Sequence, residues 1–90
     1  MTNKKTGFFE AIGDPIRRKI LDLLFNEERH VETLTQDLYL TRPSISHHLK
    51  ILNEAKVIEP KIRGNRTYYR VQCDVIEENC KGLMEKFSKN

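Results

Sequence analysis

The clearest pattern of apolar and polar positions lies in residues 41–55, TRPSISHHLKILNEA. Thr41 is a favoured N-cap residue, and Pro43 is tolerated in a first helical turn because its missing N–H has no partner there. At about 100° per residue the helix separates into two faces. The apolar face carries Ile45, His48, Leu49, Leu52 and Ala55. The polar, mildly cationic face carries Ser46, His47, Lys50 and Glu54. Such a helix suits a DNA major groove, but an ordinary amphipathic surface helix has the same pattern.

Two helices are predicted before this stretch. The apolar residues in 8–12 predict a short helix, which Gly13 can end. Asp14 followed by Pro15 is a strong helix start. The helix that follows has apolar residues at the spacing of a core-facing stripe, namely Ile16, Ile20, Leu23 and Leu24. The basic triplet 17–19 beside this stripe is more typical of a solvated face than of a phosphate clamp.

A third helix is predicted from about Thr33 to Tyr39, after the polar turn 26–30, and Val31 can add a short strand. A connection of about three residues then leads to Thr41. A short helix, a tight turn and a second, capped helix form the helix-turn-helix layout. In that layout the second helix reads base edges and the first crosses the DNA backbone.

After Ala55 the pattern changes from helical to alternating. Residues 57–62 predict one strand, 63–66 a turn and 67–71 a return strand rich in β-branched and aromatic residues. Pro60 cannot donate to a ladder, so its strand is expected at a sheet edge or at a bulge. The tip and flanks of this hairpin carry Lys61, Arg63, Arg66 and Arg70.

A last helix is predicted from Asp74, as its N-cap, to about Phe87. It carries a narrow apolar stripe of Ile76, Cys80, Leu83, Met84 and Phe87. Together with Phe8, Phe9 and Ile12, this stripe is either a dimer interface or monomer core. A chain of 90 residues has few places to bury all of it, which favours a homodimer.

The totals predict one domain spanning residues 1–90. Sixteen Lys and Arg against thirteen Asp and Glu give a net charge of +3, a weak basic excess that permits nucleic-acid binding without requiring it. No signal peptide is apparent, and no apolar run approaches about 18 residues, so no membrane partner is expected and the predicted location is the cytoplasm.

Three blocks, 12–21, 44–55 and 63–71, resemble the ArsR/SmtB family of winged helix-turn-helix repressors. The short length is most similar to that of the small SdpR-like autorepressors. The resemblance implies a mostly α-helical fold of about five helices plus a two-stranded wing, and a homodimer formed through the first and last helices. It also implies that the two copies of helix 42–55 in the dimer enter successive major grooves of an inverted-repeat operator. Wing 57–71 then reaches the DNA backbone or the minor groove. Many relatives have Gly where Lys56 stands, so Lys56 predicts either a strained left-handed residue or a different helix end.

The predicted DNA-binding residues lie on the recognition helix and the wing. They are Thr41, Arg42, Ser44, Ser46, His47, Lys50, Arg63, Asn65 and Arg66. Base-edge contact is expected from Arg42, Ser44 and His47, and phosphate or base contact from Ser46 and Lys50. The wing arginines are expected at phosphate or in the minor groove, with Asn65 serving the turn. His48 is expected to pack inward with a hydrogen-bond partner. For the polar residues of the recognition helix, the alternative to DNA contact is an ordinary solvated face.

No metal site and no cofactor are predicted. Relatives that bind thiophilic metals carry Cys-x-Cys at the start of the third helix, where this chain reads His30-Val31-Glu32. Others bind zinc through the last helix, where this chain has acids but no histidine. Cys73 and Cys80 lie about 10 Å apart along a helix, too far for a disulfide within it. A disulfide between subunits, with a thiol redox response, remains one interpretation. The alternative is a structural role, with Cys80 as a small core residue and Cys73 as a strand-end residue.

Enzymatic activity is not predicted, because no serine, histidine and acid fall in a recognisable nucleophile arrangement. The main rival to DNA binding is a winged helix that binds only other proteins. Such modules usually lose the basic wing or the polar recognition face, and this chain keeps both. The operator, the regulated genes and the effector are not specified by the sequence.

Overall fold

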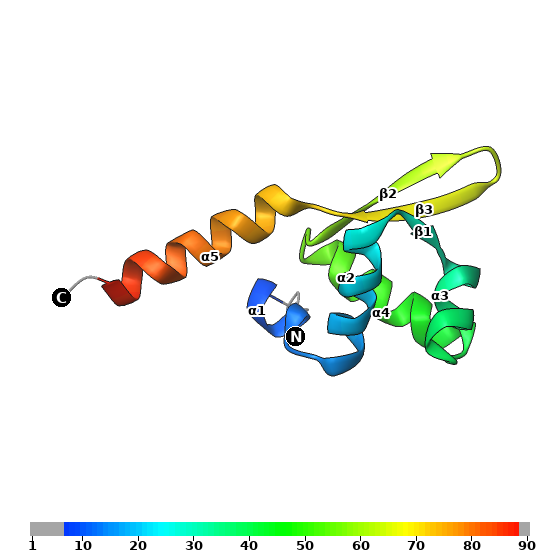
Figure 1. The fold of residues 1–90 in the computed structure, drawn as a ribbon, viewed down its shortest axis with the longest axis horizontal. Coiled ribbons are helices and arrows are strands. Elements are labelled where there is room, and N and C mark those ends of the chain that lie inside the picture. The colour runs from blue at the N-terminus through cyan, green and yellow to red at the C-terminus, as the bar shows by residue number, and fades with distance from the viewer. Residues whose placement is uncertain (1–6, 89–90) are drawn as a thin grey trace, which may run out of the picture.

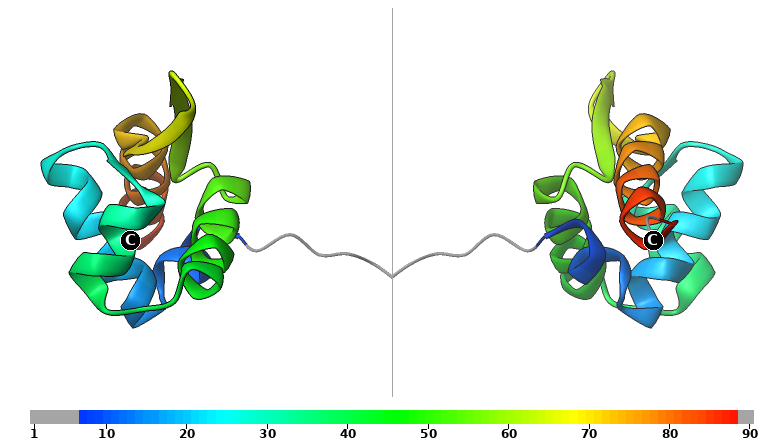
Figure 2. Two further views of the ribbon diagram at one scale, coloured as in Figure 1. Left: turned by 90° about the vertical axis from the view of Figure 1, so that its right-hand side faces the viewer. Right: turned by 90° about the vertical axis from the view of Figure 1, so that its left-hand side faces the viewer.

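The computed structural model describes residues 7–88, in which five helices and three short strands follow one another along the chain (Figure 1). The elements are α1 (Phe8–Ile12), α2 (Pro15–Asn26), β1 (Arg29–His30), α3 (Val31–Leu38), α4 (Arg42–Glu54), β2 (Ile58–Arg63), β3 (Arg66–Val71) and α5 (Cys73–Ser88). The hairpin β2–β3 stands above the helices, and α5 projects from the body along the long axis of the molecule (Figures 1 and 2). The fold is a winged helix-turn-helix, as predicted.

Two predicted N-caps begin α2 and α4. The carboxylate of Asp14 accepts hydrogen bonds from the backbone N–H groups of Ile16 (2.9 Å) and Arg17 (3.0 Å). The hydroxyl of Thr41 accepts from the N–H of Ser44 at 3.3 Å. Each cap satisfies backbone donors that the first helical turn leaves without partners. Both helix starts were therefore predictable from residue type alone.

One hydrophobic core joins the helices to the sheet. Its fully buried members are Ala11, Ile20, Leu21, Leu24, Leu34, Ile45, Leu49, Leu52, Val57 and Ile58. Burying a side chain of the Leu or Ile type contributes about 1.5–3 kcal/mol each, so this cluster dominates the stability of the fold. The α2 and α4 stripes predicted from helical periodicity supply half of it, whereas Leu21 is buried although it lies outside the predicted α2 stripe.

The sheet has three strands, namely the two predicted for the wing and a third, β1, just before α3. Its order is β1-β3-β2, and all pairs are antiparallel. The predicted strand at Val31 was wrong in position, because β1 is Arg29–His30 and Val31 already begins α3. A two-residue strand carries no alternation to detect, and its pairing with β3 is set by tertiary contacts. The β2 strand lies at the sheet edge, as Pro60 predicted.

Other helix boundaries differ from the prediction by one or two residues. The third helix is Val31–Leu38 instead of about 33–39, and α5 begins at Cys73 instead of after an Asp74 cap. The terminal positions of a helix depend on hydrogen bonds that sequence patterns locate only approximately. The recognition helix, predicted as 42–55, ends at Glu54.

Lys56 takes the left-handed conformation, with φ 65°, directly after α4. The N–H of Lys56 donates to the Asn53 carbonyl at 3.0 Å, and the N–H of Val57 donates to the Leu52 carbonyl at 3.0 Å. These two bonds define a Schellman motif, in which a glycine is the usual residue at the position of Lys56. The fully buried side chains of Leu52 and Val57 hold the motif in place. The strained alternative predicted for Lys56 is therefore the one observed.

Replacing Lys56 with Gly should raise the free energy of unfolding by about 0.5–1 kcal/mol, because Gly removes the left-handed penalty and loses part of that gain in the unfolded chain. Urea unfolding at one fixed protein concentration measures the change. Lys50→Gly, the same replacement within helix α4, should instead lower it by about 1 kcal/mol. Equal effects of the two substitutions would contradict the assignment of strain to Lys56.

Candidate nucleic-acid interface

The polar face of α4 is presented to solvent because the opposite face is buried. Ile45, Leu49 and Leu52 are between 0 % and 2 % exposed. Residues on the far side of a helix of 3.6 residues per turn must then point away from the core. The predicted contact residues Thr41, Arg42, Ser46, His47 and Lys50 are all exposed, and Ser44 is half-buried at the helix start. Among the residues that the structure describes, Ser46, His47 and Lys50 form no ion pair or side-chain hydrogen bond.

The tip of the wing presents the three other predicted contact residues. Arg63 and Arg66 face each other across β2 and β3, and Gly64-Asn65 makes the two-residue turn between them. Gly64 has φ +65°, a conformation that suits glycine in a tight hairpin turn. Arg63, Asn65 and Arg66 are exposed. The turn therefore places two arginines opposite each other at the end of the hairpin.

The two tyrosines of β3 point to opposite faces of the sheet, as predicted. Tyr69 packs against the core. Tyr68 lies under the Arg63 guanidinium, 5.5 Å from its ring centroid, and meets the His30 ring edge-on at 5.3 Å. This outer face of the sheet is the one that carries the wing arginines.

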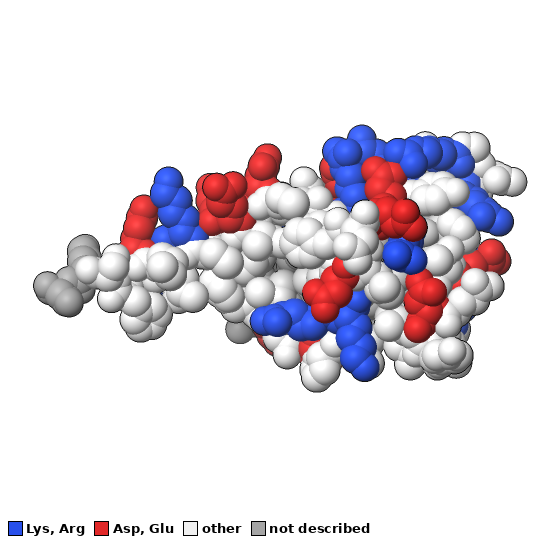
Figure 3. Space-filling view, viewed as in Figure 1, with Lys and Arg blue, Asp and Glu red and all other residues white. Residues whose placement is uncertain are grey.

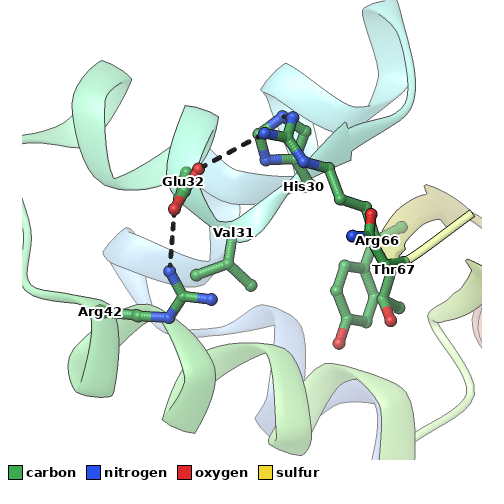
Figure 4. Close-up of a pocket in the computed structure, with 8 residues that line it drawn as sticks. His30, Val31, Glu32, Arg42, Arg66 and Thr67 are labelled. Atoms are coloured by element: carbon green, nitrogen blue, oxygen red, sulfur yellow. Dashed lines mark hydrogen bonds and ion pairs between the residues drawn. The ribbon is translucent and has the colours of Figure 1, made fainter.

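Each predicted DNA-contacting arginine has a carboxylate partner within the chain, which the sequence did not predict. Arg63 pairs with Glu28 at 2.6 Å. Arg42 and Arg66 both pair with Glu32, at 3.3 Å and 3.9 Å (Figure 4). Glu32 lies in the first turn of α3, and Glu28 lies in the turn just before β1, so both acids stand beside the wing. No local sequence pattern signals such pairs, because the partners lie far apart along the chain.

A polar hollow of about 400 Å³ lies between the first turn of α3, the start of α4 and the wing. Its lining residues are His30, Val31, Glu32, Arg42, Asn65, Arg66, Thr67 and Tyr69. Figure 4 shows Glu32 between Arg42 and Arg66, with an ion pair to each. The hollow therefore joins recognition-helix and wing residues in one charged region.

His48 packs inward with a hydrogen-bond partner, as predicted, and His47 points to solvent. The Nδ1 atom of His48 lies 3.3 Å from Nη1 of Arg17. The Nε of Arg17 also donates to the Ala11 carbonyl at 2.6 Å, and Arg18 donates to the Ile12 carbonyl at 2.7 Å. The prediction of a solvated face for the basic triplet was thus wrong for Arg17, which is partly buried against the end of α1 and His48. Arg18 and Lys19 are exposed, as that prediction has them.

The pKa values of His48 and Asp14 are both lowered. Burial lowers the pKa of His48 most, the Asp14 carboxylate raises it, and the nearby Arg17 and His47 side chains lower it further. The backbone N–H of Arg17 is the main cause of the lowered pKa of the Asp14 carboxyl group, against a smaller opposing effect of desolvation. His48 is therefore a structural residue in its neutral form.

Tyr39 is an exposed aromatic residue that was predicted to end the third helix and was not named among the DNA-contacting residues. It has φ 55°, is 92 % exposed, and lies in the turn immediately before α4. A left-handed non-glycine residue is uncommon, and Tyr gains no burial here to offset the strain. Its place in the helix-turn-helix turn is the one sequence signal that identifies it.

The predicted dimer stripe lies largely in solvent in the single chain. Phe9, Leu83, Met84 and Phe87 are 47 %, 40 %, 68 % and 77 % exposed. Phe8, Ile12 and Ile76 pack partly against the core. Along α5, charged side chains line the upper edge and uncharged ones the lower edge (Figure 3). The stripe is thus an apolar surface without a partner inside the described chain.

Both cysteine thiols are exposed, so the structural reading was wrong in this chain. Cys80 lies on the free stripe of α5 and not in the core, and Cys73 begins α5 instead of ending a strand. The periodicity that placed Cys80 with apolar residues was sound, but beyond Ile76 the stripe packs on nothing within residues 7–88. The redox interpretation of the two thiols stays a prediction.

Two negative findings apply to residues 7–88. No three His, Cys, Asp or Glu side chains come together there in an arrangement that could hold a metal ion. No helix in this range is long and apolar enough to cross a membrane.

The fold and this surface define a winged helix-turn-helix protein with an exposed polar recognition helix. Residues 14–59 match the pattern of the bacterial regulatory proteins of the arsR family. The chain is 37 % identical over 81 residues to the transcriptional repressor SdpR of Bacillus subtilis, which covers 90 % of both proteins. The chain belongs to the ArsR family and is a DNA-binding transcriptional regulator; the family comprises regulators and not enzymes.

Solved structures agree with this assignment. An ArsR-like transcriptional regulator from Rhodococcus superposes with a TM-score of 0.85 over 90 % of this chain and 76 % of its own, at 23 % identity, which supports the fold. A homodimeric winged helix-turn-helix DNA-binding domain from Mycobacterium bovis superposes with a TM-score of 0.70 at 28 % identity. It covers 88 % of this chain and 74 % of its own.

Stability should fall as the pH is lowered through about 6.5, because the pKa of His48 is below that ordinary value in the folded chain. In this range the unfolded chain binds a proton that the folded chain does not, so acid favours unfolding. The stability that the neutral form of His48 provides is fully present above about pH 6.5, and it is lost as the pH falls to the pKa of His48 in the folded chain. The lowered pKa of Asp14 acts only below its ordinary value of 3.8.

Urea unfolding of the wild type and of His48→Gln at about pH 7.5 and 5.5 measures this effect. The difference in unfolding free energy between the two pH values should be smaller for His48→Gln. His47→Gln is the matched control, because its side chain is exposed. A pH profile that His48→Gln leaves unaltered would sink the assignment.

Proposed function

We propose that the chain is a homodimeric transcriptional repressor that binds an inverted-repeat operator. The observation that carries the proposal is the burial of one face of α4, which leaves its polar face exposed beside a basic wing. In this arrangement α4 enters the major groove, and the wing reaches the backbone or the minor groove. The similarity to a protein named as a repressor supports the direction of regulation.

The start of α4 is the proposed base-reading end. Arg42, Ser44 and His47 contact base edges, while Ser46 and Lys50 contact phosphates or bases. Thr41 caps the helix and lies close to the backbone of the DNA. At the wing, Arg63 and Arg66 contact phosphate or the minor groove, and Asn65 keeps the turn. We add the exposed Tyr39 to these residues, as a contact to the DNA backbone.

The apolar stripe of α5 is the proposed dimer interface, together with exposed Phe9 and its neighbours Phe8 and Ile12 on α1. An exposed row formed by Cys80, Leu83, Met84 and Phe87 is costly in water and is stabilised by burial against a second copy. The homodimeric relative with the same fold supports this assembly. Two-fold symmetry then presents two recognition helices to the two half-sites of an inverted repeat.

A winged helix that binds only proteins is the rival function. It gives no reason for the exposed Ser46, His47 and Lys50, which form no ion pair or side-chain hydrogen bond within residues 7–88, or for two arginines at a tight hairpin tip. We therefore propose double-stranded DNA in the cytoplasm as the partner, with no catalytic step and no resident cofactor. The regulatory signal is left open.

Arg42→Ala should weaken binding to the protein's own upstream DNA by about 1–3 kcal/mol if Arg42 holds a guanine edge, and should relax sequence preference. Gel shifts with and without random competitor DNA measure both effects. Lys19→Ala is the control, because it removes one exposed positive charge on α2. Equal losses on upstream and random DNA would reduce Arg42 to a phosphate contact, and no loss on either would remove it from the interface.

Leu83→Glu should convert the dimer to a monomer at micromolar concentration, because it places a charge on the apolar stripe of α5. Sedimentation equilibrium measures the mass. Lys81→Glu, on the charged edge of the same helix, adds the same negative group and should leave the dimer intact. A monomeric wild type at micromolar concentration would contradict the proposed interface.

A further inference from the structure

Glu32 links the two parts of the proposed DNA-binding surface. Its Oε2 lies 3.3 Å from Nη1 of Arg42, the first residue of α4, and its Oε1 lies 3.9 Å from Nη2 of Arg66 on the wing. One carboxylate thus bridges two guanidinium groups that belong to different elements (Figure 4). All three side chains are more than half exposed, at 56 %, 64 % and 54 %.

The surroundings keep Arg66 directed toward this carboxylate. Its Nη1 lies 2.9 Å from Nε2 of His30, and Thr33 Oγ1 lies 3.2 Å from the same nitrogen. These groups border the polar hollow between α3, α4 and the wing. The hollow is therefore lined by two guanidinium groups, from Arg42 and Arg66, and by one carboxylate, Glu32, that pairs with both.

We propose that Glu32 occupies, in the free protein, the position that a DNA backbone phosphate takes in the complex. Glu32 is thereby a specificity-determining residue that lowers affinity for DNA of any sequence. The proposal rests on the proposed function, because it assumes that this surface binds DNA. A carboxylate and a phosphodiester are both singly charged anions, and a guanidinium binds either through the same fork of N–H groups.

The competition should act most strongly on random DNA. Binding to random DNA depends on phosphate contacts, and there no correct base draws Arg42 away from Glu32. At an operator, a base contact replaces the ion pair of Arg42. Exposed ion pairs of this kind are weak, so they can be exchanged readily. Glu32 therefore holds the arginines back from wrong sequences and releases them at the right one.

The test compares the wild type, Glu32→Gln and Glu27→Gln by fluorescence anisotropy on random and upstream duplexes at several salt concentrations. Glu27→Gln removes the same charge at an exposed site that pairs only with Arg29, at 3.8 Å, within the described chain. Glu32→Gln should bind random DNA about two- to tenfold more tightly. Its salt dependence there should steepen by about one phosphate contact. The gain on upstream DNA should be smaller.

Equal affinities of Glu32→Gln and Glu27→Gln for random DNA would overturn the proposal, and so would weaker binding by Glu32→Gln. In an Arg66→Ala background the gain from Glu32→Gln should shrink, because one of the two released arginines is then missing. Thermal unfolding verifies that each variant is folded. A wild type that binds no DNA would instead refute the proposed function itself.

Discussion

The burial of one face of α4 is the constraint on which the functional surface depends. Ile45, Leu49 and Leu52 fill the centre of the core, and they fix the rotation of the helix about its axis. Because successive residues are separated by about 100°, this fixes the direction of the polar side chains as well. His47 and His48, adjacent in sequence, are separated by the same rule into a solvent-facing residue and a packed one. The interface is thus specified by the core and needs no separate scaffold.

Electrostatics at this surface depend on placement and not on total charge. A net charge of +3 is small, and several interface cations are paired internally with Glu28 or Glu32. Such exposed pairs contribute little to stability, so their main consequence is for what the arginines can bind. A surface whose cations already have anionic partners attracts polyanions less strongly than its arginine count implies. Uncharged and base-reading contacts on α4 then carry more of the discrimination.

Local signals predicted most of the fold, and tertiary signals account for what was missed. Caps at Asp14 and Thr41 and the helical stripes are encoded within a few residues, so they were readable. The β1 strand and the pair formed by Arg17 and His48 join segments far apart, the latter 31 residues, and no periodicity reports them. At Lys56 tertiary packing overrides a local preference. Burial of Leu52 and Val57 holds this lysine in a left-handed conformation that lysine disfavours. At the site, residue types predicted which side chains are exposed, but not their internal acid partners.

A single residue joins the wing to the proposed dimer helix. Only Gln72 separates the end of β3 from the start of α5. Its backbone N–H donates to the Val57 carbonyl at 2.7 Å, and its own carbonyl accepts from the N–H of Val75 at 3.1 Å. The junction is therefore hydrogen-bonded on both sides and tied to the residue that ends the Schellman motif of α4. In the proposed dimer, the packing of α5 against its partner sets where each wing and each recognition helix stands. The spacing of the two half-sites then follows from the same apolar stripe that holds the subunits together.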